Sequence, residues 1–269
     1  MTQPYLIAVD LDGTLLNDEK KIQEKTKQAL KAARQQGHKV VISTGRPYRS
    51  SVSYYRELGL DTPIVNFNGA FVHHPLDPSW GIYHTPLELK TAKTVFEACE
   101  AFAIKNMMAE VLDDVYLQQH DDTIISALTI EPTALKTGRL GDILTDHPTS
   151  ILVHPEAEHV ATLRETLQQT HAEVIDQRTW GAPWHVIEIV KAGMNKAVGL
   201  KKVAAYFNIP RERVIAFGDE DNDLEMIEYA GHGIAMGNAI ETLKNIADDV
   251  TKTNEDDGIA HYLRQVIGI

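Results

Sequence analysis

Two carboxylates separated by a single residue follow the first apolar segment of the chain. Asp10 and Asp12 come directly after residues 5–9, which are all apolar, and Gly13 and Thr14 follow them. Such a segment predicts a buried parallel strand, and open α/β sheets bind ligands beyond the carboxyl ends of their strands. Two acids this close repel each other unless a cation or a shared proton lies between them. The pattern therefore indicates metal or proton-transfer chemistry, and an acidic turn without a chemical role is the alternative.

Two further segments offer groups that suit a bound anion. Thr44 and Gly45 follow the apolar segment 39–43. A hydroxyl group and an exposed N–H at a strand end can hold a phosphate, or they can simply cap the next helix. Lys196 is predicted in the first turn of a later helix. A lysine there can balance the charge of a phosphate, or it can project into solvent.

An acidic cluster follows the predicted strand 214–217. It consists of Gly218, Asp219, Glu220, Asp221, Asn222 and Asp223. Four acids at a strand-to-helix junction repel one another without a hard cation, although acids also favour the start of a helix. An EF-hand calcium loop would need glycine at its sixth position and glutamate at its twelfth, where this chain has Leu224 and Ala230. Magnesium held by few carboxylates and by substrate oxygens fits this cluster better than calcium.

The predicted elements place these segments in one α/β domain that a second domain interrupts. Strand and helix alternate over residues 1–70, with a third strand at 63–65, and again after residue 190, which predicts a parallel sheet. The elements predicted between them are antiparallel strands at 71–84, a helix at 86–102, strands over 105–131, a strand at 150–154, a helix at 156–170, and strands at 172–176 and 186–190. This order is typical of an antiparallel α+β domain. We therefore predict a core of residues 1–84 and 191–269 and an inserted domain of residues 85–190.

Composition narrows the class of partner and the compartment. The formal charge of -12 argues against a nucleic acid or an anionic membrane as the main partner. The single cysteine, Cys99, excludes an internal disulfide, fits a reducing cytoplasm and lies on the apolar face of a predicted helix, so we expect a buried thiol. No segment has the length of a membrane span or of a signal peptide, so we expect a cytoplasmic protein. The twelve histidines lack the spacing or the partner ligands of a zinc site.

In their order and placement, the four polar segments resemble the four motifs of the haloacid dehalogenase-like hydrolase superfamily. The most specific points of similarity are Thr-Gly-Arg-Pro at 44–47, GDEDNDLEMIEYAG at 218–231 and Gly-Ile-Ala-Met-Gly-Asn-Ala at 233–239. Within the superfamily, the chain is similar to Cof-type phosphatases and to the YidA-like sugar phosphatases. The resemblance implies a Rossmann-like doubly wound parallel sheet as the core, and an inserted α+β cap domain of the C2B type.

The resemblance also implies a role for each motif residue. Asp10 would be the nucleophile that forms an aspartyl-phosphate, and Asp12 would protonate the leaving oxygen and later activate water. Mg²⁺ would be held by Asp10, by the backbone carbonyl of Asp12 and by Asp219. The phosphate contacts would come from Leu11, Thr44, Gly45, Lys196 and Asn222. Asp223 would orient Lys196 or a metal-bound water, while Glu220 and Asp221 would be structural.

The implied activity is the Mg²⁺-dependent hydrolysis of a small phosphorylated metabolite, such as a sugar phosphate. A phosphomutase would use the same residues, and a sensor that binds the phosphate without turnover is an alternative from another class. A monomer or a weak homodimer is expected. The cap would exclude water and supply specificity. The candidates for specificity are Arg46 and, in the loop before the predicted strand 186–190, Arg178, Trp180 and Trp184, although that loop can equally pack between domains.

Overall fold

The computed structural model describes residues 3–128, 130–171, 174–179 and 185–269, which form two compact units. The first unit comprises the described residues up to Arg46 together with Ser51–Tyr83 and Asn195–Ile269. The second unit comprises Pro47–Ser50 and His84–Met194. The chain therefore leaves the first unit and returns to it, which is the connectivity of an inserted domain.

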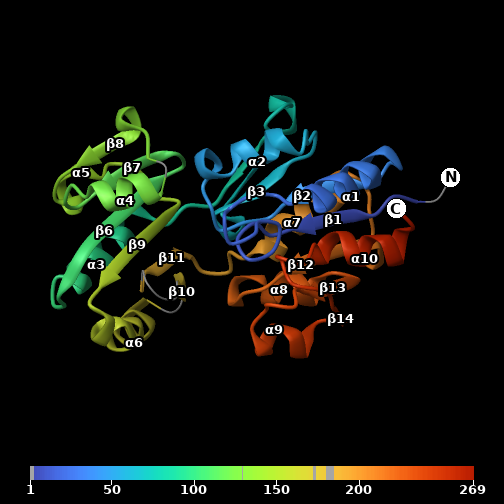
Figure 1. The fold of residues 1–269 in the computed structure, drawn as a ribbon. Helices are drawn as coiled ribbons and strands as arrows, with labels where there is room; N and C mark the ends of the chain where they lie inside the picture. Colours follow the sequence, from blue (N-terminus) through green and yellow to red (C-terminus); the bar gives the residue numbers. More distant parts are fainter. Residues whose placement is uncertain (1–2, 129, 172–173, 180–184) are drawn as a thin grey trace. The chain divides into compact units, whose positions relative to one another are not determined.

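The first unit is built on a parallel sheet of five strands in the order β14-β13-β12-β1-β2 (Figure 1). The strands are β1 (Leu6–Val9), β2 (Lys39–Ile42), β12 (Val214–Gly218), β13 (His232–Ala235) and β14 (Asp249–Val250). All residues of β1 and β12 are buried, because helices cover both faces of the sheet. β1 pairs with β2 on one side and with β12 on the other, so the order of the strands reverses there. Ligands of such sheets bind at this reversal.

Among the described residues, six α-helices accompany this sheet. They are α1 (Glu24–Gln35), α2 (Val52–Glu57), α7 (Lys196–Tyr206), α8 (Leu224–Tyr229), α9 (Glu241–Ile246) and α10 (Gly258–Ile267). α1 packs against α10, and α7 packs against α8, which gives two helical layers. The apolar residues of α1 and α10 face inward, as their 3.6-residue periodicity predicts. Within the described residues, no helix combines the length and the apolar composition that a membrane crossing requires.

The predicted third parallel strand belongs to a different sheet. β3 (Ile64–Asn66) pairs antiparallel with β4 (Phe71–His73), and β5 (Ile82–His84) completes a separate three-stranded sheet. An isolated parallel bridge between Ser43 and Val65 joins β3 to the residue that follows β2. The prediction of 63–65 as a third strand of the parallel sheet needs correction: β3 has a parallel bridge beside β2, but the tight turn Phe67–Gly69 pairs it with β4 in a separate sheet.

The second unit is built on a mixed sheet of six strands in the order β10-β11-β9-β6-β7-β8. The strands are β6 (Ile104–Val111), β7 (Asp114–Leu117), β8 (Leu135–Thr137), β9 (Ser150–Pro155), β10 (Ile175–Thr179) and β11 (Ile187–Lys191). Apolar residues from this sheet, from α3 (Leu89–Cys99), from α5 (Leu140–Ile143) and from α6 (Val160–His171) form the main core. Cys99 is fully buried in that core, as expected.

Two predictions for the second unit need correction. The segment 105–131 is not a series of strands throughout, since it ends in α4 (Asp122–Ala127). The carboxylate of Asp121 starts this helix by accepting the N–H groups of Thr123 and Ile124 at 2.9 and 3.1 Å. The strand predicted at 172–176 is β10, which begins at Ile175 and continues to Thr179. Arg178 therefore lies in a strand opposite Glu188, and not in the predicted loop.

Candidate active site

A buried lysine joins two acids that come from distant parts of the sequence. Asp10 follows β1, and its N–H donates to the carbonyl of Phe217 in β12 at 3.2 Å, which holds it at the junction of the two strands. Lys196 is the first residue of α7, and its side chain is fully buried. Its Nζ lies 2.7 Å from Oδ1 of Asp10 and 2.7 Å from Oδ1 of Asp223. An ammonium group without access to water needs both partners to stay charged.

The turn after β12 is organised by one carboxylate. Oδ2 of Asp223 accepts the N–H groups of Asp219 and Glu220 at 3.0 and 3.2 Å. Both oxygens of Asp223 are thus engaged, one by Lys196 and the other by the turn. Asp219 accepts the hydroxyl of Thr14 on its Oδ1 at 2.6 Å. Asp223 therefore holds Lys196 and the turn after β12 in position.

Gly13 allows the segment after β1 to approach Asp219. Its φ of +76° lies in the left-handed region, and a Cβ at this position would lie 2.1 Å from Oδ2 of Asp219. Any other residue would be strained and would also collide with this carboxylate. Gly13 is therefore required because the carboxylate of Asp219 approaches the backbone so closely.

The acids form a cluster that suits a hard divalent cation. One oxygen each of Asp10, Asp219 and Asp223 lies within 4.8 Å of the others, and among the described residues this is the only such group. Burial, the main cause, raises the pKa of Asp10 to about 7 although Lys196 opposes it. Burial and the charge of Asp10 raise the pKa of Asp219 to about 8. A cluster of oxygen donors without histidine or cysteine fits Mg²⁺. The hydrogen bonds described above use Oδ1 of Asp10 and Oδ1 of Asp219, so the second oxygen of each carboxylate can face the metal.

Asp12 is held as a carboxylate by two cations. Arg46 donates to both of its oxygens, from Nε at 2.6 Å and from Nη2 at 2.7 Å, and Nζ of Lys20 lies 2.8 Å from Oδ1. Burial alone would raise the pKa of Asp12, but the two cations outweigh it and lower this pKa to about 2. Asp12 is therefore in its base form in this arrangement. Arg46, a predicted specificity residue, is occupied by Asp12 rather than left open toward a substrate.

Two of the predicted phosphate-binding residues, Leu11 and Thr44, lie just beyond the ends of β1 and β2. Thr44 is buried, and its N–H donates to the carbonyl of Val65 at 2.9 Å. Its hydroxyl oxygen accepts the N–H of Arg46 at 3.1 Å, so its own proton is directed elsewhere and can be donated to an anion. Leu11 is buried directly after Asp10, and its carbonyl accepts the N–H of Leu16 at 2.8 Å.

Asn68 belongs to this region, although it is not among the predicted site residues. Nδ2 of Asn222 donates to Oδ1 of Asn68 at 3.1 Å, and a Cβ on Gly45 would lie 3.2 Å from the same oxygen. The two amides therefore pack directly against the backbone of Gly45. Asn68 follows β3 just as the other motifs follow their strands. Polar residues beyond a strand end were thus the signal that could have found it.

The predicted specificity loop cannot be placed in the same way. Trp180 and Trp184 lie outside the described residues, and of Arg178 the structure describes the backbone in β10. Their role in specificity stays a prediction.

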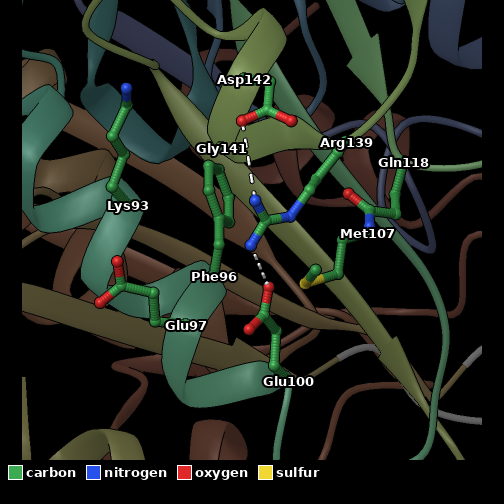
Figure 2. Close-up of a pocket in the computed structure, with 9 residues that line it drawn as sticks. All are labelled: Lys93, Phe96, Glu97, Glu100, Met107, Gln118, Arg139, Gly141 and Asp142. Atoms are coloured by element: carbon green, nitrogen blue, oxygen red, sulfur yellow. Dashed lines mark hydrogen bonds and ion pairs between the residues drawn. The ribbon is translucent and has the colours of Figure 1, made fainter.

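A pocket of about 120 Å³ lies in the second unit (Figure 2). Its lining residues are Lys93, Phe96, Glu97, Glu100, Met107, Gln118, Arg139, Gly141 and Asp142. Figure 2 shows the guanidinium of Arg139 between two acids, 2.9 Å from Glu100 and 3.7 Å from Asp142. Metabolite sites are usually larger, about 300–1,000 Å³, and have polar groups free for the ligand. None of the strand-end residues lines this pocket, so it is not the candidate active site.

A model of the haloacid dehalogenase-like hydrolase family matches residues 7–263 of the chain. The match spans every motif described above and both compact units.

Curated proteins and solved structures show the same relationship. The chain is 54% identical over 268 residues to 5-amino-6-(5-phospho-D-ribitylamino)uracil phosphatase YitU of Bacillus subtilis (strain 168), which covers 100% of this chain and 99% of that protein. It is 31% identical over 286 residues to pyridoxal phosphate phosphatase YbhA of Escherichia coli (strain K12), covering 96% and 97% of the two chains. A crystal structure of a haloacid dehalogenase-like hydrolase from Bacteroides thetaiotaomicron has a TM-score of 0.83 at 26% identity and covers 98% of this chain and 100% of that one. The predicted fold class is confirmed.

Proposed function

The chain belongs to the haloacid dehalogenase-like hydrolase family and is a phosphatase of small phosphorylated metabolites, and on this premise we propose that it works with Mg²⁺ through an aspartyl-phosphate. The single observation that carries the mechanism is the buried triad Asp10, Lys196 and Asp223 at the carboxyl ends of β1 and β12. An acid with an adjacent fixed cation can meet a phosphate dianion, which an isolated carboxylate would repel.

In the first step, an oxygen of Asp10 attacks the phosphorus, and the bond from phosphorus to the ester oxygen breaks. The leaving oxygen takes a proton from Asp12, so that an alcohol departs and Asp10 carries the phosphoryl group. Lys196, Thr44, the N–H groups of Leu11 and Gly45, and Asn222 hold the phosphate oxygens. Donors that the fold holds at fixed positions need little reorganisation as charge moves to those oxygens.

In the second step, Asp12 takes a proton from water, and the water oxygen attacks the phosphorus of the aspartyl-phosphate. Inorganic phosphate leaves, and the carboxylate of Asp10 is restored. The pairing with Arg46 lowers the pKa of Asp12 and so favours the carboxylate, which is the form that this second step needs. For the first step Asp12 must separate from Arg46 and gain a proton. We propose that the anionic substrate draws Arg46 away.

Asp10, the carbonyl of Asp12 and Asp219 would hold Mg²⁺, with Asp223 orienting the turn and Lys196. The metal would shield the nucleophile from the incoming dianion and stabilise charge on the transferred group. Residues 85–190 would act as a cap that excludes water and recognises the rest of the substrate.

For the substrate, we propose a small metabolite with a phosphate monoester on a sugar or a sugar alcohol. The first compound to test is 5-amino-6-(5-phospho-D-ribitylamino)uracil, because the relative that is 54% identical over its full length is named for it. Pyridoxal phosphate and simple sugar phosphates complete the comparison. A cytoplasmic location and a monomer or weak homodimer stay part of the proposal.

The test is a phosphate-release assay on this panel, with Mg²⁺ and with excess chelator. We expect turnover that needs Mg²⁺ and a preference for the ribitylaminouracil phosphate. Transfer of the phosphoryl group to a sugar instead of water would identify a phosphomutase. Binding without phosphate release would identify a sensor, and undiminished activity in chelator would contradict the metal assignment.

A further inference from the structure

The turn Phe67–Gly69 has an unusual backbone. Its three residues have φ values of 49°, 51° and 92°, so two residues with a Cβ lie in the left-handed region beside a glycine. Phe67 is fully buried in this conformation. Each non-glycine residue held there costs about 1–2 kcal/mol, and such conformations persist where the surroundings demand them. Contacts with other elements must therefore hold the turn in this conformation.

The turn is fastened on one side to the loop that follows β2. The N–H of Asn68 donates to the carbonyl of Thr44 at 3.1 Å, and the N–H of Phe67 donates to the carbonyl of Arg46 at 3.3 Å. Nδ2 of Asn66 donates to the same Arg46 carbonyl at 2.9 Å. Three hydrogen bonds thus determine the course of the loop that carries Thr44 and Gly45.

The turn is seated on the other side against the start of α7. A Cβ on Gly69 would lie 2.2 Å from the carbonyl oxygen of Asn195, which caps this helix. Lys196 is the next residue. Gly69 thus allows the turn to pack directly against Asn195. This packing positions the start of α7 and therefore the side chain of Lys196.

The side chain of Asn68 reaches the polar segment 218–223 through Asn222. Its Oδ1 accepts Nδ2 of Asn222 at 3.1 Å, and both amides pack against Gly45. A carbonyl oxygen that engages one N–H of the Asn222 amide fixes the plane of that amide. The second N–H of Asn222 then has one defined direction. Thr44, Lys196 and Asn222 come from three separate motifs. The Phe67–Gly69 turn contacts Thr44 and Asn222 directly, and it contacts Asn195 directly before Lys196.

We propose that Asn68 is a positioning residue of the phosphate site, which acts by orienting the Asn222 amide against the loop at Thr44 and Gly45. This inference rests on the proposed function, because it assumes that these residues hold the phosphate. The left-handed turn presents the Asn68 side chain to Asn222 while its backbone holds the loop. Asn68 touches Asn222 and acts on the phosphate through it.

The test compares Asn68→Gly with Asn222→Ala and with the double variant. Glycine keeps the left-handed backbone and its hydrogen bonds and removes only the amide. We expect kcat/KM for the phosphate ester to fall about 10- to 100-fold in Asn68→Gly, as misplaced contact groups cost in other enzymes. The dissociation constant of inorganic phosphate, measured by calorimetry, should rise about tenfold, which corresponds to about 1.4 kcal/mol. The double variant should lose little more than Asn222→Ala alone.

A matched control is available at Asn208. This residue has the same φ of 51° but is exposed and lies outside the site, so Asn208→Gly should leave both activity and phosphate affinity unchanged. A merely structural role for Asn68 would lower the melting temperature and add to the loss in Asn222→Ala. Phosphate affinity and kcat/KM at wild-type values in Asn68→Gly, or additive losses in the double variant, would overturn the inference. An inactive wild-type protein would instead contradict the proposed function, and phosphate affinity would still test Asn68.

Discussion

At the scale of single residues, the site pairs each reactive acid with a different environment. Asp10 is buried beside Lys196, whereas Asp12 is half exposed and held by Arg46 and Lys20. The two carboxyl groups are separated by one residue in the sequence, yet the pKa of Asp10 is raised and that of Asp12 is lowered. These directions are the reverse of those that a nucleophile and a proton donor need. The proposed mechanism therefore requires a cation that favours ionised Asp10, and the separation of Arg46 from Asp12 so that Asp12 can gain a proton.

The first prediction concerns the nucleophile. Asp10→Asn should reduce kcat by about 10⁴-fold or more, because the amide cannot form the covalent intermediate. The measurement is phosphate release under saturating substrate. Trapping with a labelled phosphate ester should detect the phosphorylated protein in the wild type and not in the variant. A variant that keeps more than a tenth of the wild-type kcat would rule out Asp10 as the nucleophile.

The second prediction concerns the acid. Asp12→Asn should impair hydrolysis of an alkyl phosphate far more than that of p-nitrophenyl phosphate, since p-nitrophenolate departs without a proton. The ratio of the two kcat/KM values is the readout, because a general loss of folding or of metal cancels in it. Equal losses with both substrates would argue against Asp12 as the proton donor.

At the scale of elements, the active residues lie at strand ends or helix starts and depend on close backbone approaches. Gly13 admits Asp219, and Gly69 admits the start of α7. In both cases a side chain would have to occupy space that another element fills. Packing between elements therefore sets the positions of residues that are far apart in sequence.

The third prediction separates such packing from backbone strain. Gly69 and Gly81 have nearly the same φ, 92° and 93°, but a Cβ on Gly81 would have nothing within 4 Å. Gly81→Ala should lower the free energy of unfolding by about 1 kcal/mol through backbone strain alone. Gly69→Ala should cost about 2–4 kcal/mol and should also reduce kcat, because the collision with Asn195 displaces α7. Urea denaturation of both variants checks this, and equal losses would mean that the approach to α7 is unimportant.

At the scale of the whole molecule, the acidic cluster links stability to pH and to metal. Without metal, the folded protein keeps protons on Asp10 and Asp219 up to pKa values of about 7 and 8, whereas the ordinary value is 3.8. The folded state therefore binds more protons than the unfolded state between these limits. This contribution to stability is fully present below about pH 4 and is lost as the pH rises toward 8.

The fourth prediction follows from this linkage. Added Mg²⁺ should raise the melting temperature more at pH 8 than at pH 5, because the metal binds the ionised acids. Thermal denaturation with chelator and with Mg²⁺ at both pH values is the measurement. Asp219→Asn is the control, and its melting temperature should respond little to Mg²⁺. A Mg²⁺ effect that is equal at both pH values would show that the cluster does not titrate in this range.

The sequence by itself determined the parts of this protein that depend on neighbouring residues. The runs of apolar residues identify β1, β2 and β12, and the acids, hydroxyl and glycines directly after them identify one ligand-binding edge, because parallel strands end on the same side of a sheet. Strands and helices alternate in the core segments but not in the segment between them, and this change indicated the inserted α+β part. The family follows from the same local motifs.

Only the tertiary structure decided which groups from different segments meet. No periodicity links Asn68 to Asn222, or Arg46 to Asp12, since these contacts depend on turns that bring strand ends together. The same holds for the pairing of β3 with β4 through a tight turn and for α4 in place of a predicted strand, where the carboxylate of Asp121 caps the helix. The pKa values of Asp10 and Asp12 also belong to this level, because burial and fixed partners set them, and neither exists before the chain is folded.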